Sequence, residues 1–353
     1  LTPFHRDAVA RQHGLIAEIA AANVAGWPVG TEFSAGPKMA QITLEVILRT
    51  AIGASDPARL AALREVMPRL LSLGPVDTLA IARPGLQQRW PWRSLRRRIA
   101  EADALLYAEI AERRSDPDLA GRTDALAMLV RAADDDGRTM SDSELRDQLM
   151  TLLLAGHETT ANSLSWALER LTRHPQALAR AVRAAEASAA GDPAGDEYLD
   201  AVAKETLRIR PVVFDVGRVL KEPVDVAGYR LPAGVTVIPA IGLVHANESV
   251  YDGAAQFRPE RMLPDAQGCR ASLSPTTWLP FGGGNRRCLG ANLALAEMRI
   301  VLREVLRHAD LETTTAPDER PRLNGIIHQP RRGARIRVRA LRSSQRDAEN
   351  LSR

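Results

Sequence analysis

One long helical segment, residues 141–173, constrains the fold of this chain more than any other part of its sequence. Ser141 and Glu144 have the S-x-x-E spacing of a capping box, which marks the start of a helix. Leucines follow at helical spacing, namely Leu145, Leu149, Leu152 and Leu153. The pattern stops before Pro175, so at about 1.5 Å per residue the helix is roughly 48 Å long. We expect it to cross a whole domain through the core.

The rest of the chain is predicted to be mainly α-helical with a minor β portion. Helical periodicity is present over residues 5–55, 58–115, about 196–209 and about 290–308. Short strands are expected in VVFDVGRVL, PVDVAGYRLPAG, VTVIPAIGLV and, near the end, RIRVRAL. No internal repeat or low-complexity linker interrupts the sequence. We therefore predict one domain over residues 1–353, helix-rich over 1–211 and mixed over 212–353.

Charge and cysteine content exclude several classes of protein. The 47 Lys and Arg residues against 43 Asp and Glu give a net charge of +4, too small for charge-driven binding of nucleic acid. No apolar run reaches the length of a membrane span. Cys269 and Cys288 are too few for a disulfide framework, which favours a reducing cytoplasm. The high Ala and Arg content suggests a bacterial source.

The most basic segment, residues 86–98, has two interpretations. The favoured one is a solvated helix start with Trp90 and Trp92 packed beneath it. The alternative is a basic helical binding protein that uses Arg83 to Arg98, and no second aromatic-basic module supports it. We predict no nucleic-acid partner.

The stretch WLPFGGGNRRCLG, residues 278–290, places Cys288 directly before an apolar-periodic helix. Unpaired N–H groups and the positive dipole end at a helix N-terminus favour the thiolate form of a cysteine. Gly282, Gly283 and Gly284 allow a tight backbone that aims further N–H groups at the sulfur. The sequence predicts a loop that holds a thiolate against a large, flat group.

Several uses of this sulfur remain open. A nucleophile needs a nearby His base, and only His308 lies within thirty residues. Zinc lacks partner ligands, and a buried structural cysteine is a further alternative. A haem iron needs one axial thiolate and cations for its propionates, and Arg286 supplies a guanidinium two residues earlier. Neither phosphate-binding glycine pattern is present, so the loop favours haem.

The same loop resembles the signature F-x-x-G-x-R-x-C-x-G of the cytochrome P-450 family. The matching residues are Phe281, Gly284, Arg286, Cys288 and Gly290. Three other family motifs appear in the family's order: AGHETT at 155–160, KETLRIRP around Glu205 and Arg208, and FRPERM at 257–262. In the last motif Met262 replaces the usual aromatic residue. The resemblance covers roughly the last two-thirds of a family member and implies the P-450 fold.

The resemblance implies a haem b cofactor, with Cys288 as the ligand of its iron. It assigns cofactor contacts to Arg286, Phe281, Gly282, Gly290, Arg218, Ala155 and Gly156. Arg218 matches the family's propionate-binding arginine, and an exposed strand arginine is the equal alternative. Gly156 is interpreted as leaving room where the helix approaches the flat cofactor.

Thr159 and Glu158 carry the catalytic role that the resemblance implies. In the family the threonine bonds iron-bound oxygen and the preceding acid supplies protons, which is general acid chemistry. The alternative is a threonine bonded back to a carbonyl of its own helix.

The resemblance also implies a buried structural cluster of Glu205, Arg208 and Arg261 near the cysteine loop. Taken alone, Glu205 and Arg208 could form an ordinary surface ion pair. One carboxylate shared by two guanidiniums must be densely hydrogen-bonded to tolerate burial. We predict a role in stability and haem retention for these residues, without a part in the chemistry.

The predicted activity is insertion of one oxygen atom of O2 into an apolar small-molecule substrate. No flavin or nicotinamide module is present, so electrons are expected from a separate ferredoxin-type or flavoprotein donor. Arg299, Arg303 and Arg307 repeat at four-residue spacing and are a candidate docking stripe for an acidic donor; a solvated helix face is the alternative. A truncated haem-binding relative without turnover is the second candidate function.

The start of the chain, LTPFH, has neither Met nor the pattern of a signal peptide. It resembles the stretch after the family helix that supplies a Trp and an Arg to one propionate. The resemblance therefore implies an N-terminally truncated P-450 fold, without the family's N-terminal quarter.

Overall fold

The computed structural model describes residues 6–54, 56–71, 92–264 and 274–342. These residues form two compact units. The first consists of Leu1–Asn23, Lys38–Ala161 and Asn292–Ala294, and the second of Val24–Pro37, Asn162–Ala291 and Leu295–Arg353. The interpretation of residues 1–353 as one domain stays a prediction.

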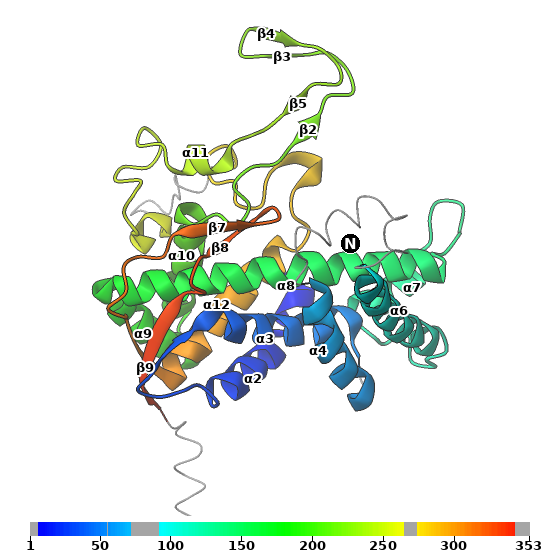
Figure 1. Cartoon of the computed structure of the whole chain (residues 1–353), viewed down its shortest axis with the longest axis horizontal. Helices are drawn as coiled ribbons and strands as arrows, with labels where there is room; N and C mark the ends of the chain where they lie inside the picture. The colour runs from blue at the N-terminus through cyan, green and yellow to red at the C-terminus, as the bar shows by residue number, and fades with distance from the viewer. Residues whose placement is uncertain (1–5, 55, 72–91, 265–273, 343–353) are drawn as a thin grey trace, which may run out of the picture. The chain divides into compact units, whose positions relative to one another are not determined.

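Helices build the first unit (Figure 1). In chain order they are α1 (Arg6–Ala10), most of α2 (His13–Val24), most of α3 (Ala35–Ile47), the π-turn η2 (Leu48–Ile52), α4 (Pro57–Leu71), α6 (Arg93–Arg114), α7 (Ala125–Arg131) and the first part of α8 (Asp142–Arg173). Gly53 ends η2 with φ 66°, where a Cβ would lie 2.6 Å from Asp124 Cγ. Glycine is therefore required at this turn.

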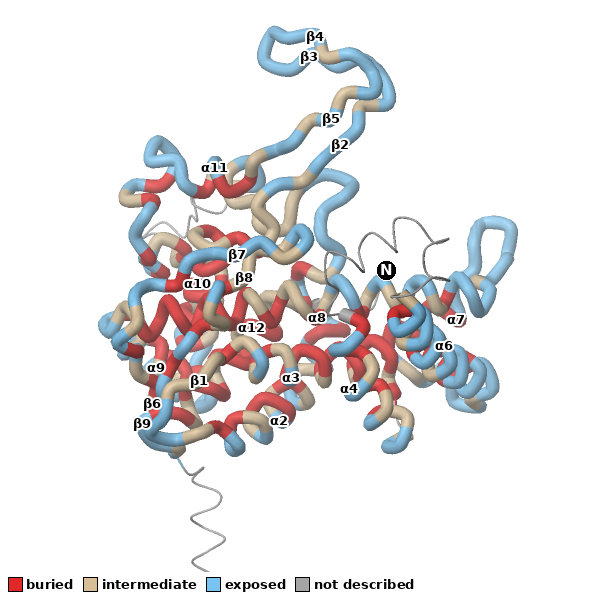
Figure 2. Tube along the Cα trace, viewed as in Figure 1, coloured by how far each residue is buried: buried red, intermediate tan, exposed pale blue. Residues whose placement is uncertain are grey.

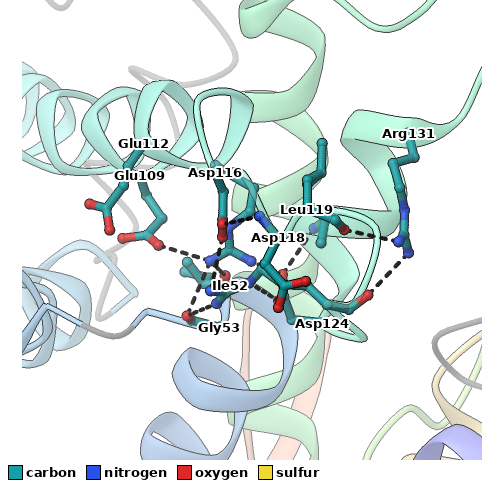
Figure 3. Close-up of polar contacts among 12 residues, drawn as sticks. Ile52, Gly53, Glu109, Glu112, Asp116, Asp118, Leu119, Asp124 and Arg131 are labelled. Atoms are coloured by element: carbon teal, nitrogen blue, oxygen red, sulfur yellow. Dashed lines mark hydrogen bonds and ion pairs between the residues drawn. The ribbon is translucent and has the colours of Figure 1, made fainter.

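A buried cluster around Arg113 ties η2, α6 and α7 together. Figure 3 labels four of its partners, Ile52, Gly53, Glu109 and Asp124. Arg113 is 2% exposed and donates to the carboxylates of Asp124 and Glu109. It also donates to the carbonyls of Ile52 and Gly53, at 3.2 and 3.1 Å. The same Asp124 caps α7 by accepting from the backbone of the helix. One arginine thus satisfies groups from three elements.

The second unit contains the remainder of α8, then α9 (Pro175–Ala189), α10 (Pro193–Ile209), α11 (Ile241–His245) and nearly all of α12 (Ala291–His308). Two 3-10 turns, η4 (Pro259–Met262) and η6 (Gly284–Arg286), belong to it as well. Helices α9 and α10 pack closely because Gly195 has no side chain. A Cβ at Gly195 would lie 2.3 Å from the backbone nitrogen of Ser188.

Among the described residues, four small antiparallel sheets complete the second unit. The largest has the order β1 (Glu32–Ser34), β9 (Arg335–Leu341), β6 (Ala309–Glu312). The others pair β2 (Arg218–Val219) with β5 (Thr236–Val237), β3 (Val224–Val226) with β4 (Tyr229–Leu231), and β7 (Pro321–Asn324) with β8 (Ile327–Pro330). Figure 2 shows β3 and β4 as an exposed hairpin, in contrast to the buried faces of α9 and α10.

The long helix α8 is confirmed, together with its capping box. The backbone N–H of Ser141 donates to Glu144 Oε2 at 2.8 Å, and that of Glu144 donates to Ser141 Oγ at 3.3 Å. Leu145, Leu149 and Leu153 are fully buried, as a helix through a core requires. No helix in the described parts of the chain is long and apolar enough to span a membrane.

One strand prediction and one helix prediction were wrong. The IGLV part of VTVIPAIGLV forms helix α11, since Pro239 cannot donate to a strand partner. Residues 32–34 were assigned to a helix and form β1, because they pair with the distant strand β9. In VVFDVGRVL only Arg218 and Val219 are strand.

Candidate haem-thiolate site

The cysteine loop of the second unit is held by its own backbone. The N–H of Cys288 donates to the carbonyl of Phe281 at 2.8 Å, and that of Gly282 donates to Leu279 at 2.9 Å. Gly282 and Gly284 have φ values of 67° and 62°, which strongly favour glycine. A Cβ at Gly282, Gly284 or Gly290 would meet nothing within 4 Å. The loop is thus tightly turned and open on the side its glycines face.

The residue that carries the sulfur, Cys288, is exposed and has a free thiol. Partial desolvation by the surrounding protein raises the pKa of this thiol, while a hydrogen bond from the Gly290 backbone and the charge of Arg287 partly oppose the shift. The backbone donor at the helix start favours the thiolate, as the sequence predicted, whereas desolvation favours the neutral thiol. A bound metal cation deprotonates a coordinating thiol outright, so the thiolate form would come with the metal.

The other predicted cofactor residues of the second unit lie at its surface or close to it. Arg286, in η6, and Arg218, in β2, are exposed. Arg218 donates to the carbonyl of its neighbour Gly217 at 2.8 Å. Phe281 is half-buried and packs edge-to-face on Trp278, with ring centroids 5.9 Å apart. These features fit a haem with a cysteine ligand. The exposed sulfur can bind iron, the exposed guanidiniums can pair with propionates, and the space beside the glycines is open.

Glu205, Arg208 and Arg261 contact one another in the second unit. Glu205 is fully buried and accepts two hydrogen bonds from Arg208, each 2.8 Å long. Arg261 donates to the same carboxylate at 3.0 Å, and so does the backbone of Arg258. The guanidinium of Arg208 also lies 5.0 Å from the ring centre of Tyr251. The carboxylate is densely hydrogen-bonded, which is the condition for burying it.

The AGHETT motif, Ala155 to Thr160, belongs to the first unit. Thr159 is half-buried, and its hydroxyl donates to the carbonyl of Ala155 at 2.7 Å. This is the contact to its own helix that the alternative interpretation expected. Glu158 is half-buried beside it.

Gly156 packs against α3, and its role in leaving room for the cofactor stays a prediction. A Cβ at this position would lie 3.0 Å from Ile47 Cδ1. The glycine therefore permits close packing of two helices. One turn earlier in α3, the buried Thr43 Oγ1 lies 2.9 Å from His157 Nδ1 and donates to the His157 carbonyl at 3.1 Å. Burial lowers the pKa of His157 to about 4, so this imidazole is neutral at ordinary pH.

The arginine stripe on α12 is not an open basic face. Arg299 is 3.6 Å from Asp196, and Arg303 is 2.8 Å from Glu304. Arg307 lies 3.5 Å from Glu186. Their side chains are only 20–32% exposed. Acidic partners on α9, α10 and α12 itself pair with these arginines, so the stripe is not a row of unpaired charges.

Three buried residues were not identified from the sequence: Thr43, His157 and His245. Each makes a side-chain contact with a residue distant in the chain, and no local pattern indicates that contact. His157 lies inside the AGHETT motif, and this was the only available signal. Cys269 and Trp90 lie outside the described residues.

Comparisons with known proteins assign the family. The cytochrome P-450 family model matches residues 37–336. Cytochrome P-450 135B1 of Mycobacterium tuberculosis is 72% identical over 340 residues, which cover 96% of this chain and 71% of that protein. Cytochrome P-450 135A1 of the same species is 37% identical over 337 residues, 95% of this chain and 72% of its own length.

Solved structures agree on the fold. The retinoic acid-bound cyanobacterial CYP120A1 has a TM-score of 0.81 at 26% identity, over 96% of this chain and 76% of that one. The heme domain of cytochrome P450DA has a TM-score of 0.82 at 24% identity, over 97% and 75%. This chain belongs to the cytochrome P-450 family. The predictions of a bacterial-type member and of the mainly α P-450 fold are confirmed.

Proposed function

We propose that this protein is a haem-thiolate monooxygenase that inserts one oxygen atom of O2 into an apolar small-molecule substrate. Family and fold support haem-thiolate monooxygenase chemistry in general. The observation that carries the proposal is the cysteine loop, in which an exposed sulfur follows a tight, glycine-lined turn.

The proposed holding residues for haem b are Cys288 as the iron ligand and Arg286 and Arg218 for the propionates. Phe281, Gly282 and Gly290 shape the loop around the sulfur, and Ala155 and Gly156 are the proposed contacts from α8. A haem held through a cysteine thiolate supplies the activation of O2, since the thiolate pushes electron density to favour O–O cleavage. The protein supplies binding and orientation for that chemistry.

Glu158 and Thr159 are the proposed proton-delivery residues. The Thr159 hydroxyl lies 2.7 Å from the Ala155 carbonyl of its own helix. We propose that this hydroxyl turns from the carbonyl to pass a proton at Oγ1, and that the Glu158 carboxylate replenishes it. An adjacent hydroxyl and carboxylate can divide proton transfer into two short steps.

The substrate and the electron donor are proposed by class only. The retinoic acid bound to CYP120A1 supports an apolar ligand with one polar end. The donor is proposed to be a separate ferredoxin-type or flavoprotein partner. The ion pairs of the α12 arginines weaken the case for that stripe as its docking face. A cytoplasmic location completes the proposal, based on the two cysteines of the chain.

Thr159→Ala tests the proton-delivery role. The ratio of product to electrons consumed is expected to fall by about 10²-fold, the lower range for a positioned proton donor, with peroxide rising instead. A panel of retinoids, lipids, sterols and aromatic compounds, screened by spectral titration, supplies the substrate.

Thr151→Ala is the matched control, because Thr151 makes the same type of bond to its own helix, 2.8 Å from the Asp147 carbonyl. The control is expected to keep wild-type coupling. Unchanged coupling in Thr159→Ala would contradict the role of this hydroxyl. Full haem binding without turnover in the wild-type protein would instead favour a non-catalytic haem protein.

A further inference from the structure

His245, the last residue of α11, is buried in the second unit with 1% exposure. Its Nε2 accepts the backbone N–H of Leu279 at 2.9 Å. An accepting Nε2 must be unprotonated, so a neutral ring carries its hydrogen on Nδ1. Within the described part of the chain, Nδ1 is buried without a hydrogen-bond partner. The contact with Leu279 therefore dictates both the tautomer and the orientation of the ring.

The backbone of His245 is bound to the buried Glu205–Arg208–Arg261 cluster. Its carbonyl accepts from Arg208 Nη1 at 2.7 Å. The same guanidinium holds Glu205 through two bonds, so Arg208 has little freedom to move. His245 thus contacts the cluster through its main chain and Leu279 through its side chain, and the two contacts span 34–37 residues of sequence.

Leu279 leads directly into the cysteine loop. Its carbonyl accepts from Gly282, and Phe281, two residues further on, accepts from Cys288. The stretch before Leu279 is also held: Trp278 donates to the carbonyl of Lys204 in α10 at 3.3 Å. Hydrogen bonds therefore run without a gap from the carboxylate of Glu205 through His245 to the backbone of the cysteine.

The electrostatic surroundings keep the ring in its accepting form. Burial and the positive charge of Arg208 lower the pKa of His245 to about 4. Glu205 and Arg261 are the other charged members of the cluster, and Tyr251 packs edge-on against the ring, 6.5 Å away. At ordinary pH the imidazole stays neutral and keeps the lone pair that Leu279 needs.

We propose that His245 is a positioning residue, which transmits the fixed geometry of the Glu205–Arg208–Arg261 cluster to the loop that carries Cys288. The inference rests on the proposed function, in which Cys288 is the haem ligand. Groups outside the coordination sphere commonly orient a ligand in this way, and their removal weakens metal binding. His245 itself touches no reacting atom in this assignment.

The test compares His245→Gln, His245→Asn and His245→Leu in the full chain. The Gln amide can place an oxygen near the position of Nε2, whereas the Asn amide reaches only the position of Nδ1. His174→Leu is the control for loss of another packed histidine. His174 directly follows α8, its Nδ1 lies 2.7 Å from the Arg170 carbonyl, and its ring contacts Phe257. Two readouts are used: hydrogen exchange of the Leu279 amide, and the thiolate-type absorption band of the reduced, carbon-monoxide-bound haem.

We expect exchange at Leu279 to rise about tenfold in the Leu and Asn variants, as for one lost hydrogen bond, and to stay near wild type in the Gln and His174→Leu variants. In the Leu and Asn variants, retention of haem that shows the thiolate band should weaken about 10- to 100-fold. The Gln variant should restore it. Rapid exchange of Leu279 in the wild-type chain, or equal behaviour of Gln and Asn, would overturn the proposal.

The exchange readout needs no haem, so it separates the two hypotheses. If the wild-type chain binds no haem, the proposed function is contradicted. If His245→Leu then still loses protection of the Leu279 amide, the hydrogen bond between His245 and Leu279 is nevertheless supported. Faster exchange with an unchanged thiolate band would show a contact that does not position the cysteine, and would overturn the inference alone. If His245→Leu does not fold, the Gln and Asn pair decides.

Discussion

Glu205→Ala is expected to lower the free energy of unfolding by about 3–5 kcal/mol, which is the range for breaking a buried ion pair from one side. The substitution leaves the guanidiniums of Arg208 and Arg261, 1% and 8% exposed, without the carboxylate they share. It also removes the acceptor of the Arg258 backbone. We expect haem to be lost as well, because the cluster holds the stretch that leads to the cysteine loop.

Denaturant unfolding and haem content measure this effect. Glu186→Ala is the control, since Glu186 is 55% exposed, pairs with Arg307 at the surface, and should change stability by less than about 1 kcal/mol. A Glu205→Ala protein that unfolds like wild type and retains full haem would show that the cluster has no structural role.

Arg113→Met is expected to lower the free energy of unfolding by about 3 kcal/mol. Its loss leaves the buried carboxylates of Glu109 and Asp124 with fewer hydrogen-bond donors. The carbonyls at the end of η2 also lose the hydrogen bonds that Arg113 donates to them. The expected value lies at the lower end of the usual range because Arg59 still pairs with Glu109 and Arg122 with Asp124. Figure 3 labels the two carboxylates, Glu109 and Asp124.

Arg114→Met, one residue further along α6, is the matched control. Arg114 is 33% exposed and pairs with Asp142, which is 55% exposed, so we expect a change below about 1 kcal/mol. Thermal unfolding of the two variants under identical conditions gives the comparison. Equal shifts would mean that burial of the Arg113 cluster adds nothing to its stabilising effect.

Local signals in the sequence predicted the helical part of the fold well. Ser141 and Glu144 are three residues apart, and the capping bonds between them depend on nothing else in the chain. The end of α8 at Arg173 follows from Pro175 in the same way. By contrast, β1 exists only because residues 335–337 pair with it, and no pattern within residues 32–34 indicates that partner.

In the candidate site too, features set by neighbouring residues were predicted, and contacts between distant segments were not. The spacing of Phe281, Gly284 and Cys288 is local and led to the family, which the comparisons then showed. The packing partner of Gly156 and the contact between His245 and Leu279 join distant segments, and the sequence indicated neither. The α12 arginines had the spacing of an exposed stripe, yet acidic residues of α9 and α10 pair with two of them.

The most direct test of the account is the absorption spectrum of the reduced, carbon-monoxide-bound protein after reconstitution with haem, recorded for wild type and Cys288→Ala. The account predicts a Soret band with the thiolate-type carbon-monoxide signature in wild type and its disappearance in Cys288→Ala. A wild-type protein that stays colourless, or a Cys288→Ala variant whose spectrum is unchanged, would contradict Cys288 as the ligand of the haem iron.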